Sequence, residues 1–159
     1  MKTNIITVGS IKKDYLQLGI NDFVKRLQPY AEVNIIELSD ERISGNLSRA
    51  EKIQIIDKEG ERILNHVSNT TYIIALDVKG KPMTSRGLAK SIQNLQVQGY
   101  SSITFIIGGA LGISDKVLKQ ANYNLSLSHM TFTHQMVRLI LIEQVYRAFK
   151  IIRGEPYHI

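Results

Sequence analysis

The sequence contains no cysteine among its 159 residues. Disulfide frameworks, cysteine-ligated zinc sites and thiol nucleophiles are therefore excluded, and nothing in the chain requires an oxidising compartment. Long apolar runs are also lacking, since stretches such as Leu139–Ile142 are far shorter than the ~18 residues of a membrane span. The amino terminus has no extended apolar core of the kind found in signal peptides. These absences predict a cytoplasmic protein that does not associate with a membrane.

Two common phosphate-binding motifs are missing as well. No GxGxxG pattern follows the first apolar run, and no Walker lysine motif occurs. Rossmann-type dinucleotide binding, P-loop phosphoryl transfer and a flavodoxin-like cofactor enzyme are thus disfavoured. His129 and His134 lie five residues apart, but no third zinc ligand of suitable type stands near them. We therefore expect no metal centre.

Acidic residues are scarce in the last hundred positions. Residues 1–60 carry nine basic and nine acidic side chains, so the net charge of +6 arises entirely after residue 60. A basic surface favours a polyanionic partner, nucleic acid first, because neutralising phosphates releases counterions. Charge alone leaves open the simpler alternative that it only keeps the protein soluble.

Hydrophobic patterning predicts one α/β domain over residues 1–159. Strand-like, β-branched runs alternate with segments of helical spacing, which is typical of a parallel sheet covered by helices on both faces. The predicted strands are 5–8, 33–38, 72–76, 103–107 and 124–127. The predicted helices are 14–28, 48–67, 85–97, 114–121 and 133–152.

The last predicted helix has two notable features. More than half of its circumference is apolar, so we expect a second cover beside the sheet, which another copy of the chain could supply. Glu143 and Arg147 stand four residues apart and can form an ion pair, which could equally be an ordinary surface contact.

Ligands of open parallel sheets bind beyond the carboxyl ends of the strands, which singles out three segments. The first is Leu76-Asp77 followed by Gly80-Lys81-Pro82, the second is the glycine-rich Gly108–Gly112, and the third is Ser126–His134. Glycines allow the backbone to approach a ligand, and hydroxyl groups before a helix suit a polar or anionic one. A ligand-free tight turn and purely structural histidines remain alternatives.

The carboxyl terminus is unusual because a tyrosine and a histidine follow the helix-ending Gly154 and Pro156. Chain termini commonly fray, so a disordered end is one interpretation. The other is that the tail lays Tyr157 and His158 across a nearby site, including that of a neighbouring subunit.

A set of short motifs resembles one known family. The motifs are Leu76-Asp77, Gly80-Lys81, Ile106-Ile107-Gly108-Gly109 with Gly112, Leu125-Ser126-Leu127-Ser128 with Met130-Thr131, His134 with Val137-Arg138, Glu143–Ala148, and Pro156-Tyr157-His158. In this order and spacing, over essentially the whole chain, they are similar to the ribosomal RNA large-subunit methyltransferase H family of the SPOUT class. Two positions depart from the family pattern. Thr133 replaces a common proline, which changes only how the helix opens, and Arg86 replaces a common acidic residue, which changes local helix charge.

The resemblance implies a deep trefoil knot in the carboxyl-terminal half and an obligate homodimer. It also implies that S-adenosylmethionine is the methyl donor and that N3 of a pseudouridine in 23S ribosomal RNA is the acceptor, on assembled ribosomes. A ribosome-binding factor of the same fold without catalysis is the alternative.

The resemblance also assigns roles to individual residues. The cofactor would be surrounded by Leu76, Gly108, Leu127, Ser128, His129, Met130, Thr131 and Phe132. His158 is the candidate general base, or the group that orients the nucleobase, since histidines exchange protons near neutral pH. Tyr157 would stack on the target nucleobase or form a hydrogen bond with it. RNA phosphates or the dimer seam would engage His134, Arg138, Arg147 and Arg153.

Overall fold

Each predicted apolar run forms a strand of one parallel sheet. The computed structural model describes residues 1–159. Its strands are β1 (Lys2–Val8), β2 (Glu32–Leu38), β3 (Tyr72–Pro82), β4 (Ser102–Ile107) and β5 (Tyr123–Ser126), in the spatial order β2-β1-β4-β3-β5. All four neighbouring pairs are parallel, so every strand ends at the same edge of the sheet.

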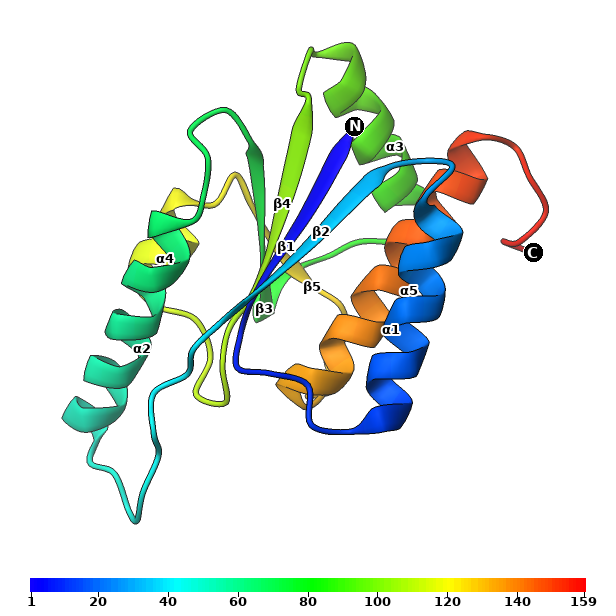
Figure 1. Ribbon diagram of the computed structural model, residues 1–159. Coiled ribbons are helices and arrows are strands. Elements are labelled where there is room, and N and C mark those ends of the chain that lie inside the picture. Colours follow the sequence, from blue (N-terminus) through cyan, green and yellow to red (C-terminus); the bar gives the residue numbers. More distant parts are fainter.

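Five helices cover the two faces of this sheet. They are α1 (Asp14–Leu27), α2 (Arg49–Asn65), α3 (Ser85–Val97), α4 (Asp115–Gln120) and α5 (His134–Ile152). Figure 1 shows α1, α3 and α5 on one face and α2 with α4 on the other. The predicted helix-covered α/β sheet is confirmed. No helix combines the length and apolarity that a membrane span requires.

The hydrophobic core has two unequal layers because neighbouring strand residues point to opposite faces. Ile5 and Phe105 belong to a cluster of 19 buried residues beneath α1, α3 and α5. Ile6 and Ile106, their chain neighbours, belong to a cluster of 7 beneath α2 and α4. The larger layer therefore anchors α5, the helix that carries the candidate residues His134, Arg138 and Arg147.

Side-chain caps fix where the helices begin. Ser48 and Glu51 form the reciprocal capping box that opens α2. The hydroxyl of Thr133 accepts a hydrogen bond from Met136 N at 3.2 Å, so α5 starts at His134. The threonine that departs from the family pattern thus supplies a cap, which a proline side chain does not offer.

The third strand is longer than predicted. It continues to Pro82, with a shift in its register against β5 between Leu76 and Lys81. A Cβ atom on Gly80 would lie 2.6 Å from the carbonyl oxygen of Asn124, so glycine permits the close approach there. The turn-like residues after Leu76 therefore mark an irregularity within the strand rather than its end.

Helix α5 finds most of its second cover within its own chain. It packs between α1 and α3, and Gly19 of α1 lies so close that an added Cβ atom would stand 2.9 Å from Leu139 Cδ1. Leu141, Val145 and Ala148 are completely buried as a result. We expected a second protomer because more than half of the surface of this helix is apolar. Packing within the chain covers most of that apolar surface.

Candidate active site

A cavity of about 770 Å³ opens at the carboxyl edge of the sheet. Small-molecule sites typically measure ~300–1,000 Å³, so its size suits a cofactor or substrate. The irregular part of β3 contributes lining residues from 76–78, and the ends of β4 and β5 with the segments that follow them contribute others from 107–113 and 125–133. The starts of α1 and α5 contribute others from 13–16 and 134–137. The three segments singled out from the sequence therefore meet in a single cavity.

The exit of β4 is a tight glycine turn. Gly112 N donates a hydrogen bond to the Gly109 carbonyl oxygen at 3.1 Å, closing a bridge between the two residues. A Cβ atom on Gly108 would lie 2.4 Å from the Gly112 carbonyl oxygen, and Gly112 has a φ of 101°. Larger residues do not fit this backbone, so the turn forms a wall of main-chain atoms.

A buried carboxyl group lies behind this turn. Glu59 on α2 is only 4% exposed, and its Oε1 accepts a hydrogen bond from Glu41 N at 3.0 Å. Its Oε2 has no partner, and a Cβ atom on Gly109 would stand 2.8 Å from it. Burial raises the pKa of Glu59, and the Asp40 carboxylate raises it further. Glu59 was not singled out from the sequence, although it stands four residues before the buried Ile63.

Seven of the eight predicted cofactor residues line the cavity. They are Leu76, Gly108, Leu127, Ser128, Met130, Thr131 and Phe132. The eighth, His129, is exposed and lies outside the lining. The loop bends at Ser128, whose Oγ accepts from Met130 N at 3.0 Å and whose carbonyl oxygen accepts from Ser126 Oγ at 3.1 Å. This local turn accounts for the exclusion of residue 129.

The first turn of α5 completes the wall. His134, Gln135 and Val137 all line the cavity, so His134 is a cavity residue in this structure rather than a surface group. Burial lowers the pKa of His134, and the nearby Arg138 guanidinium lowers it further. A neutral imidazole at pH 7 offers one hydrogen-bond donor and one acceptor to a ligand.

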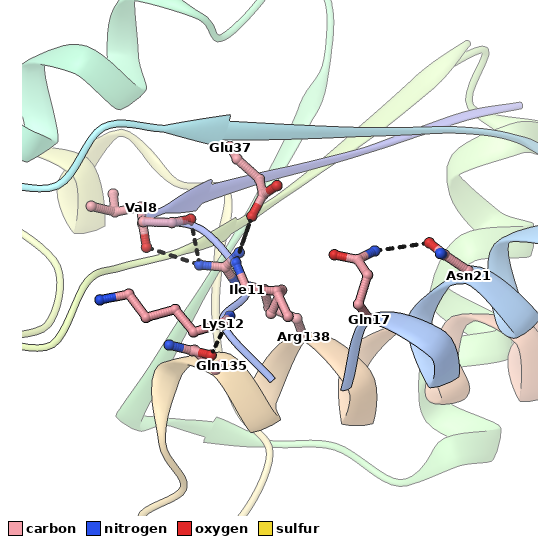
Figure 2. A network of polar contacts seen from close by, with 9 residues as sticks. Val8, Ile11, Lys12, Gln17, Asn21, Glu37, Gln135 and Arg138 are labelled. Carbon is pink, nitrogen blue, oxygen red and sulfur yellow. Dashed lines mark hydrogen bonds and ion pairs between the residues drawn. The ribbon is translucent and has the colours of Figure 1, made fainter. Parts of the chain in front are cut away.

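Arg138, which we predicted to contact RNA, is enclosed by the protein. It is 3% exposed, and its Nη1 donates to Glu37 Oε2 at 2.8 Å. Its Nη2 donates to the carbonyl oxygens of Val8 at 2.9 Å and Gly9 at 2.8 Å, as Figure 2 shows. A guanidinium held in this way does not reach a phosphate, so its role lies inside the fold.

A second polar cluster lies along the second half of α5, from its middle residue Glu143 onward. Glu143 Oε1 accepts hydrogen bonds from Arg147 Nη2 at 2.6 Å and from the Tyr157 hydroxyl at 3.0 Å. The Tyr157 ring packs edge-on against Tyr146 with 4.9 Å between centroids, and the Arg147 guanidinium stands 4.6 Å from the Tyr157 centroid. His158 Nδ1 lies 3.4 Å from Arg147 Nη1. The tail is therefore packed on the helix, and the Glu143–Arg147 pair helps to hold it.

The cavity and this tail cluster have no residue in common. His134 and Val137 line the cavity, whereas Tyr157 and His158 do not. Figure 1 shows the chain terminus beside the carboxyl end of α5. Tyr157 and His158 therefore do not reach the cavity of their own chain. Arg153, at the end of α5, is exposed, while the Arg147 side chain is 25% exposed.

Some residues that line the cavity were not predicted from the sequence. Lys13, Tyr15 and Gln135 line the cavity but belong to no motif that we singled out. The first two follow β1, whose carboxyl end lies at the same edge as the other strand ends, and that position was an available signal. No group of three or more histidine, aspartate or glutamate side chains is arranged to hold a metal ion.

A helix-covered parallel sheet with a cavity at its strand carboxyl ends defines a ligand-binding α/β domain. Within that class, the family model described as "Predicted SPOUT methyltransferase" matches residues 1–158. A protein of Halothermothrix orenii named "Ribosomal RNA large subunit methyltransferase H" is 68% identical over 99% of both chains. The protein of Alkaliphilus oremlandii with the same name is 53% identical, again over 99% of both chains. The chain belongs to this ribosomal RNA large subunit methyltransferase H family of SPOUT proteins.

A solved structure supports the fold independently. The structure described as that of "a probable methylase family protein from Haemophilus influenzae Rd KW20" superposes with a TM-score of 0.55. It covers 99% of this chain and 70% of that chain, at 10% sequence identity. At this identity the likeness concerns the fold alone.

Proposed function

We propose that this protein transfers the methyl group of S-adenosylmethionine to N3 of a pseudouridine in 23S ribosomal RNA, on assembled ribosomes in the cytoplasm. Support comes from the relatives named as large-subunit rRNA methyltransferases. The observation that carries the proposal is the meeting of the three predicted segments, from β3, β4 and β5, in one cavity of suitable size.

The cavity lining fits an adenosyl group. Leu76, Leu127 and Phe132 provide apolar surface for a purine, and the Gly108–Gly112 turn provides backbone at close range. Larger side chains in that turn would fill the space that the ligand needs. S-adenosylmethionine supplies an electrophilic methyl group on its sulfonium when it is bound. This chain's own contribution is to position the donor and the acceptor base.

We further propose a homodimer in which the tail of one protomer completes the cavity of the other. The reason is that Tyr157 and His158 do not line the cavity of their own chain and instead pack on α5 beside Glu143. Tyr15 and Leu18, at the start of α1, are 62% and 70% exposed, and Tyr15 lines the cavity. Apolar side chains at such a mouth suit burial by a second copy. The proposal includes the deep trefoil knot that the family resemblance implies for the carboxyl-terminal half.

In the proposed reaction, N3 of the pseudouridine attacks the methyl carbon and the carbon–sulfur bond breaks. The electron pair of that bond stays on sulfur, and the N3 proton leaves for a base. His158 of the partner subunit takes this proton or orients the nucleobase, and Tyr157 of the partner subunit stacks on it. Arg147 and Arg153 contact RNA phosphates, and the exposed Lys12 and Lys13 add positive charge at the mouth.

The test is methyl transfer from labelled S-adenosylmethionine to ribosomes that lack the modification. We expect label in 23S RNA, and nuclease digestion followed by mass spectrometry should locate it on N3 of a pseudouridine. Ribosomes that already carry the modification serve as the control and should remain unlabelled. Binding of S-adenosylhomocysteine and of ribosomes without any transfer would instead support the non-catalytic ribosome-binding factor.

A further inference from the structure

Arg138 joins three parts of the fold from inside the protein. Its position on α5 is one turn beyond the cavity residue His134. From there its guanidinium reaches Glu37 at the end of β2 and the carbonyl oxygens of Val8 and Gly9 at the end of β1. These carbonyl groups lie where the β1 ladder ends, so the arginine satisfies acceptors that the sheet leaves free.

Two further hydrogen bonds extend this network to the segment between β1 and α1. Glu37 Oε2 also accepts from Ile11 N at 3.0 Å, and Lys12 N donates to Gln135 Oε1 at 3.1 Å. Figure 2 shows this segment held between Glu37 and the first turns of α5. We refer to the contacts of Arg138 and Gln135 with Glu37 and residues 8–12 as the Arg138 clamp.

The clamp connects two parts of the cavity wall, one between β1 and α1 and one at the start of α5. Lys13, Tyr15 and Leu16 follow the clamped segment directly and line the cavity. His134 and Gln135, on the other wall, stand within one turn of Arg138 on the same helix. We propose that Arg138 is a positioning residue, whose ion pair with Glu37 sets the spacing of these two walls for the adenosyl group. This inference rests on the proposed function.

Stability alone is a poor explanation for this arginine. Burying a guanidinium carries a large desolvation cost, and apolar replacements of buried ion pairs are often as stable as the pair. Here the Nε of Arg138 is buried without any partner, so the polar network is incomplete. Directional bonds to one carboxylate and two carbonyl groups do, however, define a geometry that an apolar side chain does not.

The clamp also places a fixed positive charge beside the cavity. The charged groups that act on His134 are Arg138 and Lys12, which lower its pKa, and Asp40, which raises it. Removing the arginine charge should therefore move the pKa of His134 upward, towards its ordinary value of 6.5. A change of this pKa in a variant that keeps the arginine, such as Glu37→Gln, reports a displaced guanidinium without any need for catalysis.

The experiment compares Arg138→Gln, Arg138→Lys and Glu37→Gln with the wild-type protein. Arg26→Gln is the matched control, because it removes an exposed ion pair with Asp22 on α1. Calorimetry measures the affinity for S-adenosylhomocysteine, NMR follows the titration of the His134 imidazole, and circular dichroism verifies folding. Glu37→Gln keeps the arginine and provides a second variant should Arg138→Gln not fold.

We expect the affinity to fall about 10-fold in Arg138→Gln and about 3-fold in Glu37→Gln, because displaced walls misplace the ligand. Arg138→Lys should lie between them, since one ammonium group does not reproduce the planar fork. Arg26→Gln should stay within about 2-fold. Folded Arg138 and Glu37 variants with wild-type affinity would overturn the positioning role. Failure of the wild-type protein to bind S-adenosylhomocysteine would overturn the proposed function itself, and the clamp role with it.

Discussion

The two ends of helix α5 are built from different chemistry. At its start, the cavity is walled by leucine side chains, a glycine turn and a histidine whose pKa is lowered. Along its second half, Glu143 and Arg147 form a partly buried polar cluster with Tyr157 and His158 of the tail. The first end suits a mostly apolar ligand and the second suits proton transfer and phosphate contacts. Neither Tyr157 nor His158 lines the cavity of the same chain, and on our proposal each chain contributes two separate half-sites.

The largest effect should follow a change at the cavity end. Gly108→Val places side-chain atoms against the Gly112 carbonyl oxygen, which an added Cβ atom already approaches to 2.4 Å. We expect at least a ~100-fold loss of S-adenosylhomocysteine affinity in calorimetry, because the wall must move into the cavity. Val97→Gly, at an exposed position of α3, changes the same residue types away from the cavity and should leave the affinity unchanged. Wild-type affinity in Gly108→Val would mean that the adenosyl group binds elsewhere.

The next effect isolates the tail end. His158→Ala should lower the turnover of methyl transfer by roughly 100-fold, within the range for loss of a general base, and leave the affinity for S-adenosylhomocysteine unchanged. Ile159→Ala, at the fully exposed last residue, is the control. Equal losses of affinity and turnover in His158→Ala would contradict the division of labour between the two ends.

Combining a cavity variant and a tail variant in one dimer tests whether the two ends of α5 belong to one composite site. A dimer that combines a Gly108→Val chain with a chain lacking residues 157–159 contains one intact cavity and one intact tail. If these two belong to the same composite site, an exchanged mixture should recover about a quarter of wild-type activity, since half of the dimers are mixed and each has one working site. Two inactive parents that stay inactive after verified subunit exchange would exclude the composite site.

The smallest effect concerns Glu59, behind the cavity turn. Its pKa is raised in the folded protein above the ordinary value of 4.5, so the folded state holds the proton more tightly than the unfolded state. Its contribution to stability is therefore complete below about pH 4.5 and is lost as the pH rises through the raised pKa. Glu59→Gln should remove this decline in urea unfolding between pH 4 and pH 8. Glu61→Gln, exposed on the same helix, should keep the wild-type slope.

The cavity could be predicted from the sequence because its parts follow strands that all end at one edge of the sheet. Nearly continuous apolar runs indicated parallel strands, and parallel strands bring their exits to one edge. The glycines at 108, 109 and 112 marked the exit where backbone forms the wall. The irregular end of β3 was not predicted, because Asp77 and Gly80 have the composition of an ordinary turn.

The charged residues were predicted less well, because charge suggests exposure. Arg138 stands three, four and seven residues before Leu141, Ile142 and Val145, which are all completely buried. This spacing placed the arginine on the buried stripe of the helix, and Glu59 is placed similarly before Ile63. The site of the tail cluster had no comparable signal, since no periodic pattern states where a terminal segment packs.

The contacts that hold the first residues of the tail affect how the protein binds RNA. Glu155 accepts hydrogen bonds from the Tyr30 hydroxyl at 2.5 Å and from Lys150, and Tyr157 is half-buried against the aromatic rings beside them. The conformational freedom of these residues is therefore given up when the chain folds, before any RNA arrives. A terminal segment fixed in advance adds little ordering entropy to the encounter, so more of its contact energy remains available as affinity.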